Sequence, residues 1–363
     1  MAREEERLGT ALRPATLAEV ARLAGVSTAT VARVIKSSGY VSSEARGRVE
    51  AAISAKGYRP NAIARGLRQR RSFIVGHILT SITVNPFFVN VAHWAEEEAL
   101  KHGYKTFLFN HNGSRERERL GIERFIERRV DAVLFTNALS EENVRLLADA
   151  HIPAIQLERV AAATAPSLRV DNRVGAIEAM HHLFGLGHRR IAFIGGDPNR
   201  HNHADGSDRS VEHERLEAYR SAMREAGLRV GSDHVKLGHY YRIEEGGTGI
   251  EGYRHARVVL ALRNRPTAIF ATCDILAAGV LQAVYDAGLR VPDDLSVIGF
   301  DDTLGVYLTP QLTTVAQPME ELGRLGFQMA LAAIEGQPGP SLKPLKSRLV
   351  VRHSTGIVLR GGG

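Results

Sequence analysis

The sequence has very little cysteine and no long apolar segment. One Cys among 363 residues excludes an internal disulfide bond. The first ten residues, MAREEERLGT, lack the apolar stretch that a secretory signal needs. No run reaches the roughly 18 apolar residues from which a membrane span is predicted. We therefore expect a cytoplasmic protein without membrane contact.

Signatures of catalysis are also missing. We find no strand-elbow nucleophile with its partners, no recognised metal motif and no glycine loop that would cradle a phosphate. We therefore predict neither an enzyme nor a bound cofactor or metal. The insertion RHNHADGSDRSVEHER, residues 200–215, is rich in His and Asp, but their spacing matches no standard metal site. We expect a flexible loop at the mouth of a cleft there.

Positive charge is concentrated at one end of the chain. Residues 1–71 contain 14 Lys and Arg against 6 Asp and Glu, whereas the whole chain has a net charge of +7. The rest of the chain is therefore close to neutral. A basic module on a near-neutral body predicts a polyanionic partner for the module alone, and nucleic acid fits best.

Residues 16–35, TLAEVARLAGVSTATVARVI, contain two short helical patterns with their start and stop signals. Thr16 and Glu19 form a capping box, which places the start of a helix directly after Thr16. Gly25 can adopt the left-handed conformation that ends this helix. Ser27 can cap the next helix. The pattern predicts two helices joined by a tight turn.

The second helix has one apolar side and one side of small and basic residues. Val31, Val34 and Ile35 share the inner side at about 100° per residue. A helix must come close to reach base edges in the major groove, so small outer side chains permit approach while Arg33 can contact guanine. The predicted DNA contacts on and around these two helices are Thr16, Ser27, Thr28, Ala29, Thr30, Arg33 and Lys36.

The next residues predict a third helix and then a conditional one. The third helix follows Ser42 and ends at Gly57, which closes a small three-helix core. The segment 58–71, YRPNAIARGLRQRR, is too short and Gly-interrupted to be a stable helix alone. If it folds in the minor groove, Leu67 can wedge between base steps. The other predicted contacts in this segment are Asn61, Arg65, Arg68, Arg70 and Arg71; an ordinary linker is the alternative.

After Arg71 the pattern changes to apolar runs that alternate with amphipathic stretches. Continuous apolar strands alternating with helices predict parallel sheets covered on both faces. Two successive sets, divided near Asn172, predict an α/β core of two doubly wound lobes with a cleft between them. The predicted strands are FIVGHIL, KTFLF, DAVLF, AIQL, RIAFIG, AIFAT and SVIGF, with helices at 89–102, 173–185, 213–227 and 275–288.

Ligands of open parallel sheets bind beyond the carboxyl ends of the strands. This rule selects side chains that follow the predicted strands. They are Asn85, Phe87, Asn137, Glu158, Tyr240, Cys273, Asp274 and Asp301. Asp301 could also serve as a helix cap.

Several motifs in order resemble the lactose and galactose repressor (LacI/GalR) family, over residues 15 to about 357. They are TLAEVARLAGVSTATVARVI, VSSEARGRVEAAISAKGYRPNAIARGL, NPFF at 85–88, LGHRRIAFIGG at 186–196, PTAIFATCD at 266–274, VIGFDD at 297–302 and LTTVAQP at 312–318. The resemblance implies a helix-turn-helix head and a core of two lobes like those of periplasmic sugar-binding proteins. The chain is then expected to cross between the lobes three times, near residues 171, 316 and 338. The expected parts are a disordered arm (1–13), a helix-turn-helix domain (14–60), a hinge helix (61–71) and a core (72–363), with an N-lobe of about 72–171 and 317–338 and a C-lobe of about 172–315 and 339–363.

The resemblance also implies roles for single residues. Thr28, Ala29 and Arg33 match base-reading positions, Leu67 the intercalating position of the hinge, and Tyr58 a position that supports the head. In the core, Asp301 matches a carboxylate that accepts ligand hydroxyls and Arg215 an Arg that grips ligand oxygens, although a surface ion pair is the alternative for Arg215. Phe87 and Phe88 either line the pocket or fill the core.

Two positions depart from the family pattern. Ala32 stands where the family usually has Ser, so a hydroxyl contact to DNA would be absent. Cys273 stands where the family commonly has Asn, and a thiol is a poor replacement for an amide. We favour simple packing for Cys273, because cysteine commonly behaves as a small buried hydrophobe.

The sequence thus predicts a repressor that binds double-stranded, pseudo-palindromic operator DNA as a homodimer and senses a small metabolite, a sugar or a sugar-like molecule. The chain shows no heptad pattern after its last strand, which favours a dimer over a tetramer. A solute-binding protein of the same core fold is the main alternative, but it predicts an export signal and no basic head. A corepressor-dependent regulator that binds a nucleobase is the other alternative.

Overall fold

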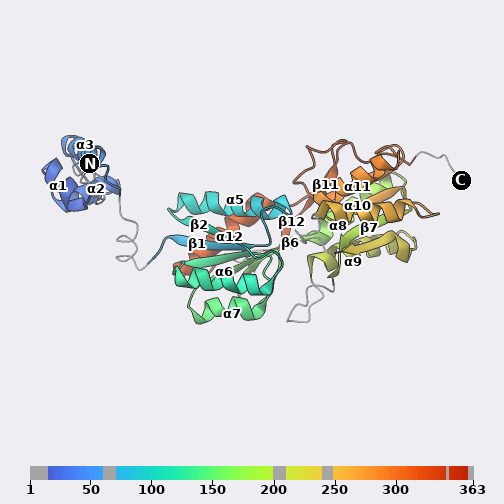
Figure 1. The fold of residues 1–363 in the computed structure, drawn as a ribbon, viewed down its shortest axis with the longest axis horizontal. Coiled ribbons are helices and arrows are strands. Elements are labelled where there is room, and N and C mark those ends of the chain that lie inside the picture. Colours follow the sequence, from blue (N-terminus) through green and yellow to red (C-terminus); the bar gives the residue numbers. More distant parts are fainter. Residues whose placement is uncertain (1–14, 60–70, 199–209, 239–247, 341–342, 359–363) are drawn as a thin grey trace, which may run out of the picture. The chain divides into compact units, whose positions relative to one another are not determined.

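The computed structural model describes residues 15–59, 71–198, 210–238, 248–340 and 343–358. The chain divides into two compact units, Met1–Ser72 and Phe73–Gly363, and Figure 1 shows their elements. The expected arm at 1–13 and most of the expected hinge helix lie outside the described residues. Within the described ranges, no helix has the length and apolar character needed to cross a membrane.

The first unit contains the three predicted helices, α1 (Leu17–Ala24), α2 (Thr28–Ile35) and α3 (Ser43–Lys56). The capping box is confirmed, because the Thr16 hydroxyl accepts from the Glu19 N–H and the Glu19 carboxylate accepts from the Thr16 N–H at 2.7 Å. Gly25 and Gly57 both end helices in the left-handed conformation. The small core between the helices consists of Val20, Ala21, Ala24, Val31, Val34, Val49 and Ala52.

The N-lobe of the second unit contains a parallel five-stranded sheet in the order β2-β1-β3-β4-β5. Its strands are β1 (Ile74–Leu79), β2 (Lys105–Asn110), β3 (Ala132–Thr136), β4 (Ala154–Leu157) and β5 (Ser167–Leu168). One hydrophobic cluster packs α5 (Pro86–Lys101) and α12 (Met319–Ile334) on one face. A second cluster packs α6 (Arg115–Glu127) and α7 (Glu141–Asp149) on the other face.

The C-lobe contains a six-stranded sheet in the order β13-β11-β10-β9-β7-β8, in which only the edge strand β13 is antiparallel. Its strands are β7 (Ile191–Gly196), β8 (Val235–Gly238), β9 (Ala268–Ala271), β10 (Ser296–Asp301), β11 (Thr313–Ala316) and β13 (Arg348–Val350). The helices α10 (Thr248–Leu260) and α11 (Asp274–Asp286) belong to one hydrophobic cluster, and α8 (Asn172–Gly185) and α9 (Val211–Glu225) to another. A short 3₁₀ helix, Ser232–His234, precedes β8.

The two lobes exchange chain segments through a narrow connection. Strand β6 (Val170–Asp171) pairs with β12 (Leu345–Lys346) between the lobes (Figure 1). The third crossing therefore lies at β12 rather than near residue 338, where we expected it. The reason is packing, because Leu345 still belongs to the hydrophobic cluster of the N-lobe.

The prediction of two parallel-sheet lobes is confirmed, and both sheets share one topology. The order 2-1-3-4-5 of the N-lobe sheet recurs in the C-lobe as β8-β7-β9-β10-β11. In such sheets the strand order reverses beside the first strand, and ligands bind at that point beyond the carboxyl ends of the strands. Two helices begin earlier than we predicted, because N-cap residues lie further upstream. Asn85 caps α5, which begins at Pro86 rather than at residue 89, and Ser210 caps α9, which begins at Val211 rather than at residue 213.

Helices α10 and α11 approach each other at glycines. A Cβ atom on Gly279 of α11 would overlap with the carbonyl oxygen of Gly249, and one on Gly252 would overlap with that of Leu276. Backbone atoms of two packed helices cannot move aside cheaply, so these positions require glycine.

We expect Gly279→Ala to lower the free energy of unfolding by about 1 to 3 kcal/mol, because the added methyl forces the two helices apart. Urea denaturation followed by circular dichroism measures the change. Gly185→Ala at the end of α8 in the same lobe is the control, since no described atom lies within 4 Å of its new methyl group. Equal stability of the two variants would contradict the packing argument.

Candidate functional site

The outer face of α2 presents the side chains that the sequence analysis selected. Thr28, Ala29, Arg33 and Lys36 are exposed, whereas Val31 and Val34 are buried. Ser27 caps the helix, and its hydroxyl accepts from the Thr30 N–H at 3.1 Å. The small and basic face is therefore free to approach a partner.

Three of the predicted residues of the first unit have structural contacts of their own. Thr16 caps α1, and Tyr58 packs half-buried against the core of the three helices. The Arg33 side chain lies along Gly39, where a Cβ atom would be 3.6 Å from Arg33 Cδ. Asn61, Arg65, Leu67 and Arg68 lie outside the described residues, and the DNA contacts stay predictions.

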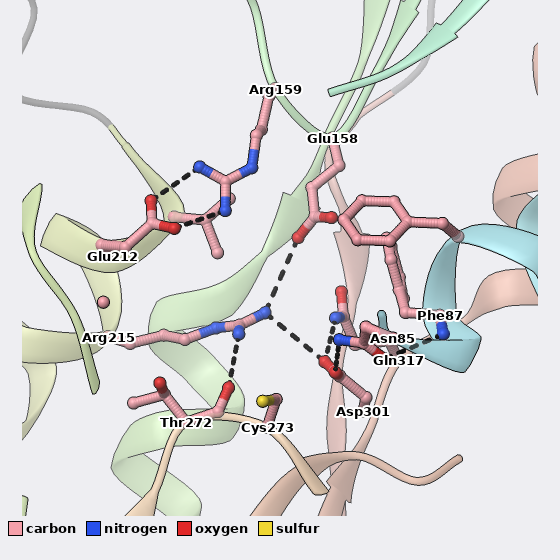
Figure 2. Close-up of a pocket in the computed structure, with 13 residues that line it drawn as sticks. Asn85, Phe87, Glu158, Arg159, Glu212, Arg215, Thr272, Cys273, Asp301 and Gln317 are labelled. Atoms are coloured by element: carbon pink, nitrogen blue, oxygen red, sulfur yellow. Dashed lines mark hydrogen bonds and ion pairs between the residues drawn. The ribbon is translucent and has the colours of Figure 1, made fainter. Parts of the chain in front are cut away.

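A cavity between the lobes collects most of the predicted effector residues. Asn85, Phe87 and Glu158 come from the N-lobe side, and Arg215, Cys273 and Asp301 from the C-lobe side (Figure 2). Phe88, on α5, also lines the cavity from the N-lobe side. The cavity is also lined by residues that the sequence analysis did not select: Arg159, Gly196, Val211, Glu212, Thr272 and Gln317.

The polar residues at the ends of strands adopt unusual backbone conformations. Glu158 follows β4 with φ 64° and Asp301 ends β10 with φ 101°. Residues other than glycine rarely adopt positive φ, because the side chain crowds the backbone. Such strain persists where surrounding contacts hold it, and it clusters at binding sites. Here it turns two carboxylates into the cavity from opposite lobes.

Asp301 is the most buried charged group of the cavity, with 2% of its surface exposed. Its carboxylate accepts from the Asn85 amide at 2.9 Å and from the Gln317 amide at 2.7 Å. Asn85 in turn caps α5, because its side-chain oxygen accepts from the Phe87 N–H. The contact therefore links a helix of the N-lobe to a strand of the C-lobe.

Arg215 supplies the positive charge beside Asp301. Its Nη2 lies 3.8 Å from Asp301 Oδ1 and 3.6 Å from Glu158 Oε1. The guanidinium is held by hydrogen bonds to Asn172 Oδ1 and to the carbonyl oxygen of Thr272 at 2.7 Å. Its Cζ lies 3.8 Å from the centroid of the Phe300 ring. Arg215 is therefore oriented before any ligand arrives, and it is buried rather than part of a surface ion pair.

Burial shifts the pKa values of three side chains that line the cavity. Loss of hydration raises the pKa of Asp301 to about 6, and the Arg215 charge opposes the shift. Burial also raises the pKa of Glu158, against the same Arg215. Burial and the Asp301 charge raise the pKa of the Cys273 thiol, so this group stays neutral. Cys273 also packs in a hydrophobic cluster of the C-lobe, as we favoured from the sequence.

Two buried side-chain oxygens of the cavity accept no hydrogen bond among the described residues. Glu158 Oε1 and Gln317 Oε1 find no hydrogen-bond partner among the described residues. A buried acceptor without a donor costs free energy, so a ligand that brings donors would be favoured. Together with the Asp301 carboxylate, these atoms suit a ligand that donates hydrogen bonds from several hydroxyl or amine groups.

The structure places two predicted effector residues away from the cavity. Asn137 is buried in the N-lobe, where its amide donates to Thr80 Oγ1 at 2.7 Å. The Asp274 carboxylate accepts from the N–H groups of Thr303 and Leu304 and from the Thr314 hydroxyl, so it holds the loop after β10. Both correct the strand-end rule, since a side chain after a strand can turn into its own lobe.

Five of the missed residues divide by the signal that they carry. Arg159, Thr272 and Gln317 follow β4, β9 and β11, so the strand-end rule could have found them. Glu212 and Val211 lie on the first turn of α9, a place that this rule does not select. Tyr240 and residues 200–209 of the insertion lie outside the described residues. Within the ranges that the structure covers, no group of three or more potential ligands could hold a metal ion.

Comparisons with known proteins agree with both units. Residues 16–61 match "Bacterial regulatory proteins, lacI family", and residues 180–355 match "Periplasmic binding protein-like domain". The ribose operon repressor of Escherichia coli (strain K12) is 35% identical over 88% of this chain and 93% of its own length. The chain belongs to the LacI family.

Solved structures of LacI-family proteins and other regulators share the fold. The Lac repressor dimer bound to operator and the anti-inducer ONPF aligns with a TM-score of 0.76 and 25% identity, over 95% of this chain and all of that chain. The complex of the transcriptional regulator CelR with cellobiose aligns with a TM-score of 0.67 and 28% identity, over 94% of this chain and all of that chain. This LacI-family chain is thus a transcriptional repressor with a DNA-binding domain and an effector-binding domain.

Because the pKa of Asp301 is raised, we predict that the free energy of unfolding depends on pH. The pKa of the unfolded carboxyl is near its ordinary value of 3.8 and that of the folded one is about 6, so ionisation between these values disfavours the folded state. We expect the stability of the parent relative to Asp301→Asn to fall by roughly 2 to 3 kcal/mol as pH rises from about 4 to about 6. Urea denaturation across this range tests it; a constant difference would contradict the assignment.

Proposed function

We propose that this chain is a cytoplasmic repressor that binds a pseudo-palindromic operator as a homodimer and responds to a small polyhydroxylated effector in the interlobe cavity. The observation that carries the proposal is the link across the cavity, in which Asn85 and Gln317 hold the Asp301 carboxylate beside Arg215. A ligand at this place contacts both lobes at once. It can therefore favour one arrangement of the lobes over another.

The DNA-binding part of the proposal rests on the face of α2. Its exposed Thr28, Ala29, Arg33 and Lys36 combine small size with positive charge. A two-fold dimer would place two such helices in successive major grooves, which is why we propose a pseudo-palindromic operator. The basic residues 65–71 would add phosphate contacts.

The effector class follows from the hydrogen-bonding inventory of the cavity. Acceptors are in surplus among the described residues, since Glu158 and Gln317 each keep an oxygen without a hydrogen bond and Asp301 is a carboxylate. Sugar hydroxyls supply the missing donors, and Phe87 and Phe88 supply apolar surface for a ring. The relatives support this class, because one is named for a ribose operon and one was solved with cellobiose.

Binding without turnover is part of the proposal. The two carboxylates face one guanidinium, and the only thiol of the sequence is neutral and buried. A nucleophile needs a neighbouring base or a lowered pKa, and burial shifts the Cys273 pKa the other way. These features support a binding site rather than a catalytic one.

The DNA-binding part predicts a base-specific loss for Arg33→Ala. We expect a loss of about 1 to 3 kcal/mol on the preferred operator and little change on random duplexes, because Arg33 would read a base edge. Fluorescence anisotropy at fixed salt measures both affinities. Arg48→Ala is the control, since Arg48 is exposed on α3 and pairs with Glu44. Equal losses on operator and random DNA would remove Arg33 from base reading.

The effector part predicts that a sugar stabilises the chain through Asp301. In a thermal-shift screen with D-ribose, cellobiose, sugar acids, polyols and nucleobases, we expect a neutral sugar or polyol to raise the melting temperature and to change operator affinity. Asp301→Ala should lose both responses while keeping effector-free operator binding. Asp149→Ala, at an exposed carboxylate on α7, is the control. A variant Asp301→Ala that still responds would contradict the site.

A further inference from the structure

The first turn of α9 carries charged side chains that pair with side chains of opposite charge on the facing N-lobe side. Glu212 pairs with Arg159, and both terminal guanidinium nitrogens of Arg159 donate to the Glu212 carboxylate, one of them at 2.6 Å. Glu214 pairs with Arg169 at 2.6 Å, and Arg215 lies 3.6 Å from Glu158. Figure 2 shows the Arg159 and Glu212 pair beside Arg215 and Glu158. One helical turn thus makes ion pairs to three residues before the first crossing.

Two of these pairs differ in how firmly they are made. The pair of Arg159 and Glu212 is bidentate, and its side chains are only 6% and 8% exposed. The pair of Arg215 and Glu158 is longer and leaves Glu158 Oε1 without a hydrogen bond among the described residues. A ligand can therefore occupy the space near Glu158 and Arg215 without breaking the bidentate pair.

The bidentate pair also connects two lobes, whereas ordinary packing contacts lie within one lobe. Arg159 directly follows β4 of the N-lobe, and Glu212 lies on α9 of the C-lobe. Opening of the lobes would separate the two charges and expose them to water, whereas neither lobe needs the pair to fill its own hydrophobic core. A bidentate Arg–carboxylate pair has a narrow geometry, so it favours one arrangement of its two supports.

We propose that Arg159 and Glu212 form an interlobe latch, which holds the lobes together in the absence of effector and so sets effector affinity. The claim that the latch sets effector affinity rests on the proposed effector site. The claim that it holds the lobes together does not. A latched cleft is already close to the arrangement that binds ligand, so less free energy is spent on closing it. Breaking the latch increases the open population, which weakens apparent effector binding and speeds effector release.

Hydrogen–deuterium exchange of the ligand-free full chain tests the latch directly. The reporters are segments 154–160 and 210–217, because the Glu158 N–H donates to Leu168 O and the Glu214 N–H to Ser210 O. We expect Glu212→Gln to speed exchange in both segments on the order of tenfold, while β3 and β7 in the two lobe cores stay unchanged. Arg159→Gln should reproduce this pattern from the other side.

Two further variants separate a latch from local damage. Glu217→Gln is the matched control, because Glu217 also lies on α9 but pairs with Arg220 on the same helix. The charge exchange Arg159→Glu with Glu212→Arg should return both segments towards the parent rates. The proposal is overturned if Glu212→Gln behaves like Glu217→Gln, if exchange rises equally in β3 and β7, or if the charge exchange restores nothing.

The effector consequence has its own readout. For D-ribose, or whichever sugar of the screen binds the parent, Glu212→Gln should raise the dissociation constant on the order of tenfold, in parallel with the exchange rates. If no sugar binds the parent, the proposed effector class fails while the exchange experiment still decides on the latch. Unchanged affinity despite faster exchange would overturn the claim that the latch sets effector affinity.

Discussion

The hydrogen bonds of the Asp301 carboxylate connect the two lobes, and the arrangement of the cavity depends on them. It is nearly inaccessible to solvent, and it is satisfied by one amide from each of two segments, Asn85 and Gln317. Burying this charge is tolerable only because Arg215 lies beside it and donors surround it. The strained backbone at Asp301 shows that the surrounding structure fixes the position of this group.

That constraint explains how a binding site can also control a conformation. Each lobe folds around its own hydrophobic clusters, so the lobes can change their arrangement without unfolding. What joins them is the paired connection of β6 with β12 and the link from β11 to α12, together with polar contacts around the cavity. Polar contacts are directional and can be exchanged for ligand contacts, whereas hydrophobic cores of this size cannot. A small molecule in the proposed effector site would therefore contact the groups that connect the lobes.

Much of the fold could be predicted from the sequence, because its local signals are strong and agree with one another. The capping box at Thr16, the left-handed glycines and the apolar strands each specify local structure within a few residues. The site was only partly predictable. The strand-end rule found Glu158 and Asp301, yet it also selected Asn137 and Asp274, which satisfy groups within their own lobes. Glu212 carried no such signal, because its role depends on which helix faces Arg159 in space.

In the proposed function, effector and operator act on one equilibrium of the same chain. Thermodynamic coupling is reciprocal, so the factor by which the effector changes operator affinity must equal the factor by which operator changes effector affinity. The most direct measurement determines all four dissociation constants on the dimeric full chain, with the sugar identified by thermal shift and the preferred operator. We predict two equal factors that differ from one. A sugar that binds at the cavity while both factors stay at one would contradict it.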